Sequence, residues 1–179
     1  VALSSVSTQG ALANMKAEVP HWDFDRVVRE TQDSWRKELN RISITSKRPE
    51  VLTNFYTAMY HACLSPTVYM DVDGQYRGLD QYNHKAQSFT NYTTFSLWDT
   101  YRALHPLFNI IQRERSNDFI NSMLAHYDQS AHHMLPIWSH YANENWCMIG
   151  YHAVSVIADA HAKGITGFDP VHALRASVA

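Results

Sequence analysis

The chain has 179 residues, of which 45% are hydrophobic and 12% aromatic, and its formal net charge is −2. A chain of this length can bury about 70% of its unfolded surface, so one hydrophobic core suffices and a second domain is not required. The small net charge, without a block of like charges, excludes the electrostatic pattern of a nucleic-acid-binding protein or of one that binds an anionic membrane surface.

The N-terminal segment opens with an alternating, serine-rich run over residues 1–7, which is typical of the end of a strand. No partner strand follows, so the run predicts a remnant of a β-structure. Asp23 then provides a helix N-cap, and Val27, Trp35 and Leu39 recur at helical spacing in a polar context. This pattern predicts an amphipathic helix that lies on the surface.

A second helix is predicted over residues 49–64, with Pro49 in its first turn and Ser65-Pro66 behind it. Residues 67–92 have no helical period and predict a long irregular connection that can hold short strands. Connections of this length inside a compact domain are usually functional.

Further helices are predicted at about residues 95–103, 114–127 and 145–163, and another begins at Pro170. Much of the helix at 145–163 is apolar nearly all round, whereas the first helix is charged over most of its surface. Buried and half-exposed helices together favour a mainly all-α fold with two concentric helical layers, as in an (α/α)6 toroid. A plain helical bundle fits the alternation nearly as well.

The sequence gives little support for a metal site or for a disulfide. Residues 71–74, Asp-Val-Asp-Gly, begin like a calcium loop but lack its later oxygen ligands, so we expect a turn capped by aspartate side chains. The histidines lack zinc-site spacing, and no metal ligand is assigned within the chain. Cys63 and Cys147 lie in apolar segments far apart, and we expect buried free thiols.

A first candidate binding site is the run that contains Trp98, Asp99 and Arg102. A carboxylate beside an indole can accept two hydrogen bonds from vicinal sugar hydroxyls while the ring stacks on the sugar. The same spacing also fits an ion pair of Asp99 with Arg102 that stabilises a helix by a few tenths of a kcal/mol. Spacing alone does not decide between the two.

A second candidate is Glu144, which lies among Trp138, Asn143, Trp146 and His152. Burial among rings disfavours a charged carboxylate and would prepare a proton donor for sugar cleavage. The alternative is a carboxylate at the start of a helix, stabilised in its charged form by the helix macrodipole. Burial raises the pKa of a carboxyl group, whereas a helix N-terminus lowers it, so the two effects oppose each other.

Six blocks of sequence carry a family likeness. They are FYTAMYH at 55–61, DVDGQYRG at 71–78, TNYTTFSLWDTYR at 90–102, INSML at 120–124, MLPIW at 134–138 and NENWCMIGYH at 143–152. Together, in this order and over nearly the whole chain, they resemble glycoside hydrolase family 92, the calcium-dependent exo-acting α-mannosidases. The resemblance implies an N-terminal β-sandwich followed by an (α/α)6 catalytic barrel.

On this resemblance, residues 1–18 are the exit of the sandwich, residues 19–48 a linker helix and residues 49–179 the first part of the barrel. The implied activity removes terminal α-linked mannose from glycans with inversion of configuration. Glu144 would be the general acid. The implied substrate contacts are Trp98, Asp99, Arg102, Trp138, Asn143, Trp146 and His152.

An inverting glycosidase needs a second carboxylate, about 6.5–9.5 Å from the first, to activate water. By resemblance this base and most ligands of the implied Ca²⁺ lie beyond Ala179, so we expect a fragment that shows no turnover alone. The implied partner is a mannose-containing glycan, and the implied location is secreted, periplasmic or on the cell surface. No nucleic acid, membrane or protein partner is indicated, and no stretch reaches the roughly 20 apolar residues of a membrane span.

Two other classes of function remain. A helical carbohydrate-binding module could hold mannose through Trp98, Asp99 and neighbouring aromatic residues without cleaving it. A purely structural helical domain is disfavoured, because it leaves the polar segment of residues 67–94 without a role.

Overall fold

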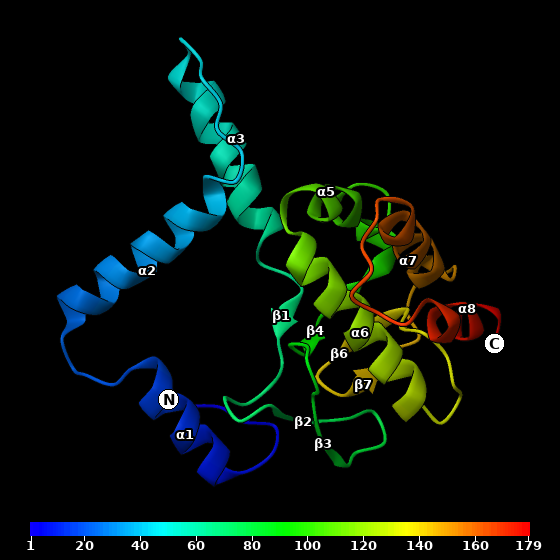
Figure 1. The fold of residues 1–179 in the computed structure, drawn as a ribbon. Helices are drawn as coiled ribbons and strands as arrows, with labels where there is room; N and C mark the ends of the chain where they lie inside the picture. The colour runs from blue at the N-terminus through cyan, green and yellow to red at the C-terminus, as the bar shows by residue number, and fades with distance from the viewer.

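The computed structural model describes residues 1–179 and is mainly helical, which confirms the all-α class (Figure 1). The helices are α1 (Thr8–Glu18), α2 (Phe24–Leu39), α3 (Pro49–Ala62), α4 (Leu97–Thr100), α5 (Leu104–Ile111), α6 (Arg113–Gln129), α7 (His152–Ala162) and α8 (Pro170–Val178). The strands are β1 (Thr67–Val68), β2 (Gln75–Arg77), β3 (Asn83–Lys85), β4 (Tyr92–Thr93), β5 (Phe95–Ser96), β6 (Trp138–His140) and β7 (Asn143–Glu144). None of the helices combines the length and apolarity that crossing a membrane requires.

The core lies where α5, α6, α7 and α8 pack together (Figure 1). Met123 of α6 is fully buried, as are Ala153 and Ala160 of α7 and Ala176 of α8. The small alanine side chains at these contacts let the helix axes approach closely. The apolar character of the α7 segment therefore reflects burial, as its composition predicts.

The first three helices form an arm that extends away from this core (Figure 1). No residue of α1 or α2 is buried, which confirms the predicted surface helix. Asp23 caps α2 by accepting a hydrogen bond from the Arg26 N–H at 3.0 Å. Trp35 packs on Tyr60 of α3, with ring centroids 4.6 Å apart.

The N-terminal segment differs from the prediction. Residues 1–7 form no strand, because the serines bond locally: Ser4 Oγ accepts from the Val6 N–H, and Ser7 Oγ accepts from the Gly10 N–H and caps α1. α1 itself was not predicted, since its apolar residues follow no helical period. Local side-chain bonds of this kind compete with strand pairing.

The polar segment before β5 holds short antiparallel strands, as predicted. β1 pairs with β4 and β2 pairs with β3, with Tyr76 opposite His84. The Asp71–Gly74 run is a turn, in which the Gly74 N–H donates to the Asp71 carbonyl and Asp73 Oδ1 accepts from the Gln75 N–H. Gly74 has φ +87°, which the turn requires.

The predicted helix at 145–163 begins seven residues later, at His152. The backbone φ angles of Trp146, Met148 and Gly150 are +53°, +71° and +90°, which a right-handed helix does not allow. The predicted helix at 95–103 is divided into β5, α4 and a turn, and α5 follows separately. Cys63 and Cys147 are free and half-buried, so the free thiols are confirmed and their full burial is not.

Candidate functional site

A three-stranded sheet joins the two sequence segments that contain the candidate residues. β6 is its central strand, with Ser96 of β5 opposite Trp138 and Glu144 of β7 opposite Ser139. The chain then continues from Ser96 into α4 and from Glu144 toward α7. The sheet therefore brings the Trp98 segment next to the Glu144 hairpin, although about 40 residues separate them in sequence.

Aromatic and cationic side chains gather where α4 meets the start of α7. The rings of Tyr101 and His152 are stacked, with centroids 4.0 Å apart and planes at 7°. The His152 ring also lies 5.5 Å from the Trp98 ring. Arg102 Cζ lies 5.1 Å from the Trp98 ring centroid and 5.0 Å from that of Tyr101. Tyr101 was not among the predicted site residues, although it lies within the same motif.

Asp99 does not pair with Arg102. Its carboxylate accepts a hydrogen bond from Ser96 Oγ at 2.6 Å, while Arg102 donates to the Trp98 carbonyl at 3.3 Å. Asp99 and Arg102 are both exposed. Of the two interpretations of this motif, the helix-stabilising ion pair is therefore absent, and both charged groups stay accessible to a polar ligand.

Glu144 is buried within its own hairpin. The side chain is 4% exposed. Its Oε1 accepts hydrogen bonds from the N–H groups of Trp138 and Trp146 at 2.9 and 3.2 Å, and its Oε2 accepts one from the Ile137 N–H at 3.0 Å. His126 Nε2 of α6 lies 3.5 Å from Oε2. Burial lowers the pKa of His126 to about 4, so this imidazole is neutral near neutral pH.

These contacts differ from those expected of a proton donor. A general acid has to reach the glycosidic oxygen of its substrate. Both oxygens of Glu144 instead face backbone donors, and the side chain is almost fully enclosed. Nor does Glu144 start a helix, because it lies in β7. The macrodipole interpretation is therefore wrong, and the geometry speaks against the acid role implied by resemblance.

The other predicted residues of the hairpin present their side chains more openly. Trp146 is 50% exposed, and its ring lies 5.3 Å from that of His132. Asn143 is exposed and donates to Asn145 Oδ1. Trp138 is half-buried. The indoles and amides at this edge of the sheet can thus cover and hydrogen-bond a sugar.

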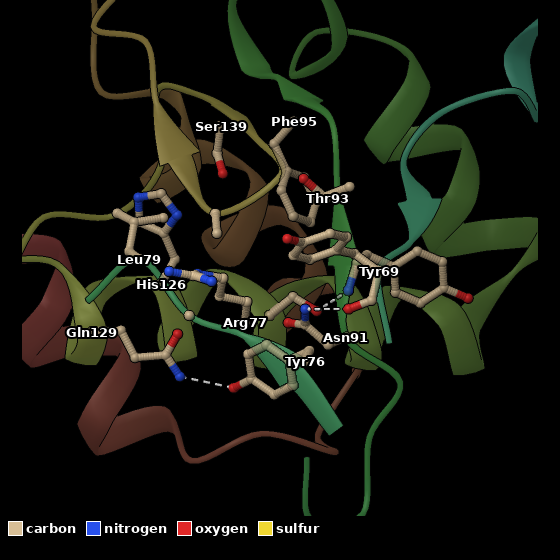
Figure 2. A pocket seen from close by; sticks show the side chains of 14 residues that line it. Tyr69, Tyr76, Arg77, Leu79, Asn91, Thr93, Phe95, His126, Gln129 and Ser139 are labelled. Atoms are coloured by element: carbon tan, nitrogen blue, oxygen red, sulfur yellow. Dashed lines mark hydrogen bonds between the residues drawn. The ribbon is translucent and has the colours of Figure 1, made fainter. Parts of the chain in front are cut away.

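Beneath the hairpin lies a small cavity with a mixed polar and apolar lining (Figure 2). Ser139 of β6 and Ser122 and His126 of α6 line it, together with Asn91 and Thr93. Figure 2 also shows Gln129 donating to the Tyr76 hydroxyl at its border, at 2.8 Å. Its volume of about 30 Å³ matches about one water molecule and is far too small for a sugar ring.

The chain does not assemble a calcium site from its own acidic residues. No group of three or more His, Cys, Asp or Glu side chains is placed to hold a metal ion. Asp71 accepts hydrogen bonds from Ser4 Oγ and Asn14 Nδ2, and Asp73 accepts from Gln75. These oxygens are thus used in protein contacts, which does not fit a calcium loop at residues 71–74.

Comparisons with known proteins agree with one another. The model of the glycosyl hydrolase family 92 catalytic domain matches residues 10–179. The family GH92 α-mannosidase BT3965 from Bacteroides thetaiotaomicron is 54% identical, with a TM-score of 0.93, over 97% of this chain and 23% of that one. The structure of the same α-mannosidase in complex with mannoimidazole is 53% identical, with a TM-score of 0.92, over 97% of this chain and 22% of that one. The family GH92 inverting mannosidase BT2199 from Bacteroides thetaiotaomicron VPI-5482 is 30% identical, with a TM-score of 0.89, over 97% of this chain and 23% of that one.

None of the curated proteins compared matches the chain. The chain spans less than a quarter of the length of each of these solved structures.

Proposed function

Since the chain belongs to glycosyl hydrolase family 92, we propose that it forms part of an enzyme that removes terminal α-linked mannose from glycans with inversion of configuration. The observation that supports this most strongly is the 54% identity to an α-mannosidase over nearly the whole chain. A relative in complex with mannoimidazole supports a mannose-type substrate. Exo action is part of the same proposal.

In this proposal the exposed residues around α4 bind the sugar. The Trp98 indole covers an apolar face of the mannose, and the Asp99 carboxylate accepts hydrogen bonds from its hydroxyls. Arg102 lies over the Trp98 ring, where it can donate to a sugar oxygen. His152, Trp138, Asn143 and Trp146 extend this surface along the hairpin.

An inverting mechanism needs two carboxyl groups, about 6.5–9.5 Å apart, one to protonate the leaving oxygen and one to activate water. We propose that residues outside positions 1–179 supply both the proton donor and the base. The buried Glu144 is not placed among the groups that touch the sugar, because its oxygens are held by backbone donors. We therefore expect no turnover from the 179 residues alone.

The finer architecture belongs to the same proposal. Residues 1–18 would be the exit of a β-sandwich domain, residues 19–48 the linker and residues 49–179 the first part of an (α/α)6 toroid. Support comes from the arm, which stands apart from the helical core and leaves Trp22 and Phe24 93% and 77% exposed (Figure 1). We also propose a secreted, periplasmic or cell-surface location and a Ca²⁺ ion whose ligands lie outside these residues.

The test uses the whole protein that carries this chain, with an α-mannoside as substrate. We expect calcium-dependent release of mannose, with the β-anomer appearing first by proton NMR, because inversion changes the anomeric configuration. A Trp98→Ala variant should raise KM, because the stacking surface is lost. Retention of the anomeric configuration would contradict the inverting mechanism.

The same experiment tests the alternative of a carbohydrate-binding module. Mannose binding that depends on Trp98 and Asp99, without any release of mannose by the whole protein, would favour that module and remove the proposed enzyme.

A further inference from the structure

We propose that Glu144 is a positioning residue: its carboxylate fixes the loop of residues 145–151 and thereby places Trp146 and His152 at the sugar-binding surface. This inference rests on the proposed α-mannoside hydrolysis and assigns Glu144 a role other than that of proton donor. The loop of residues 145–151 is called the aromatic loop below.

The first support is the pattern of backbone donors around the carboxylate. Ile137 and Trp138 lie where the chain enters β6, and Trp146 lies just after β7. N–H groups of all three point at the two oxygens of Glu144, over distances of 2.9–3.2 Å. One side chain thus ties the entry of the hairpin to its exit. Three hydrogen bonds from main-chain donors to one carboxyl group hold it in a single orientation, which makes it an anchor for the hairpin.

The second support is the backbone of the aromatic loop. Trp146 and Met148 have positive φ angles, although neither is glycine. Such conformations persist only where surrounding contacts hold them. The contacts present are the bond from the Trp146 N–H to Glu144 and the two bonds from Asn145 to the Trp138 carbonyl, at 2.9 and 3.2 Å. Glu144 and Asn145 therefore share in tying this unfavourable backbone to β6, and Glu144 provides the bond to Trp146 itself.

The third support is where the aromatic loop leads. Near its end, at Gly150, an added Cβ would lie 2.4 Å from His152 Nε2, so the loop backbone and the imidazole are in close contact. That imidazole stacks on Tyr101 and lies beside Trp98. A shift of the loop would consequently move His152 against the residues proposed to bind the sugar.

The surroundings of Glu144 also fit an anchor better than a proton donor. The side chain is 4% exposed. On its inner side lies His126, which is buried in α6 and borders the cavity of Figure 2. His126 Nε2 lies 3.5 Å from Glu144 Oε2, so no sugar fits between the two side chains.

The decisive experiment compares Glu144→Gln with wild type in the whole protein, using two α-mannosides that differ only in leaving group. Glutamine keeps the size of the side chain but replaces one accepting oxygen with an NH2 group, which cannot accept the backbone bonds. We expect kcat/KM to fall about tenfold or more and by a similar factor for an alkyl and for a dinitrophenyl mannoside, with a raised KM. The alkaline limb of the pH profile should stay in place.

A proton donor at position 144 gives the opposite pattern. The alkyl mannoside would lose nearly all activity, the dinitrophenyl mannoside would lose little because its leaving group needs no protonation, and the alkaline limb would disappear. That result would overturn the inference. Glu114→Gln, the same change at an exposed position of α6, is the matched control and should behave as wild type.

Hydrogen exchange provides a readout that does not depend on mannosidase activity, and its measurement on the wild-type protein does not depend on the folding of a variant. In the wild-type protein the Trp146 amide should exchange slowly, and in Glu144→Gln it should exchange faster, together with the rest of the aromatic loop. A rapidly exchanging Trp146 amide in the wild type would contradict the anchor. A slowly exchanging Trp146 amide in a protein that releases no mannose would contradict the proposed function but still support Glu144 as the anchor of the loop.

Discussion

Tyr101 and His152 form a face-to-face stack that joins the end of α4 to the start of α7, with ring centroids 4.0 Å apart. The two residues are 51 positions apart in the sequence, and each contacts one residue of the proposed site. The His152 ring lies beside that of Trp98, and Arg102 lies over the Tyr101 ring. The stack is therefore a structural support of the proposed sugar-binding surface.

Removing the Tyr101 ring should weaken sugar binding. A Tyr101→Ala variant loses a stacked pair, which is worth about 0.5–1.5 kcal/mol beyond buried area and corresponds to a rise in KM of about 2- to 13-fold. Tyr101→Phe keeps the ring and should stay near wild type. Steady-state kinetics on an α-mannoside checks this, with Tyr82→Ala at a 72% exposed position as control. Equal kinetics of Tyr101→Ala and wild type would show that the stack does not support the site.

A methyl group at Gly150 should disturb the proposed sugar-binding surface by displacing the His152 ring. Gly150 has φ +90°, and a Cβ there would meet His152 Nε2 at 2.4 Å. Gly164 also has a positive φ of +73°, but an added Cβ would have only Arg113 nearby, at 3.8 Å. Both Gly→Ala variants should be destabilised by about 1–2 kcal/mol through backbone strain.

Only Gly150→Ala should also lose mannosidase activity. Thermal melting measures the shared strain, and kinetics measures the difference between the two variants. Equal activity losses in both variants would assign the effect to strain alone.

Acid should destabilise the protein through its two buried histidines. Burial lowers the pKa of both His105 and His126 to about 4, from an ordinary value of 6.5. The unfolded state therefore binds protons first as the pH falls, so the stabilisation is fully present above about pH 6.5 and is lost toward pH 4. Between about pH 7 and pH 5 the loss should be about 2 kcal/mol per histidine.

Denaturant unfolding at several pH values measures this loss. A His105→Phe variant should show a shallower pH dependence than wild type, because one titrating group has been removed. An unchanged slope in that variant would contradict the assignment for His105.

The arm should loosen when its ion pair to the core is broken. Arg115 of α6 donates to both carboxylate oxygens of Glu38 on α2, with the shorter contact at 2.9 Å. Burial raises the pKa of Glu38, but the hydrogen bond from Arg41 and the charges of both arginines outweigh it and leave the pKa below its usual value. An Arg115→Met variant should lose up to about 1 kcal/mol, since the pair is partly exposed.

Limited proteolysis measures this loosening. Cleavage within residues 40–48, between α2 and α3, should become faster in Arg115→Met. Arg36→Met, which removes an exposed pair with Asp33 within α2, is the control and should leave the rate unchanged. The same rate in both variants would show that Glu38 and Arg115 do not hold the arm.

Local sequence signals account for the elements that were predicted well. Asp23 caps α2 and Pro49 begins α3, and the end of α3 lies within two residues of the prediction. Such signals act over one helical turn, so they can be read without tertiary information. α1 and α5 were missed, since α1 lacks an apolar stripe and α5 follows a short turn after α4.

In the candidate site, too, some features were predicted from local sequence and others were not. The motif around Trp98 was identified from residue types alone, and Glu144 was recognised as an unusual carboxylate among rings. Its surroundings could not be inferred, because the three N–H groups that bind it are placed by the hairpin of β6 and β7 rather than by sequence neighbours in a helix. The sequence pattern of residues 145–151 is helical, yet these contacts hold the loop in positive φ angles.

The sequence by itself determined the family, the helical class and the group of aromatic, acidic and amide residues that suit a sugar, because composition, caps and motifs are local properties. Tertiary structure alone decided that Tyr101 supports His152, that Asp99 stays free of Arg102, and that Glu144 is enclosed rather than open to a substrate. Each of these depends on which groups meet across the sheet and between α4 and α7. Whether a carboxylate is available for chemistry depends on what surrounds it in space.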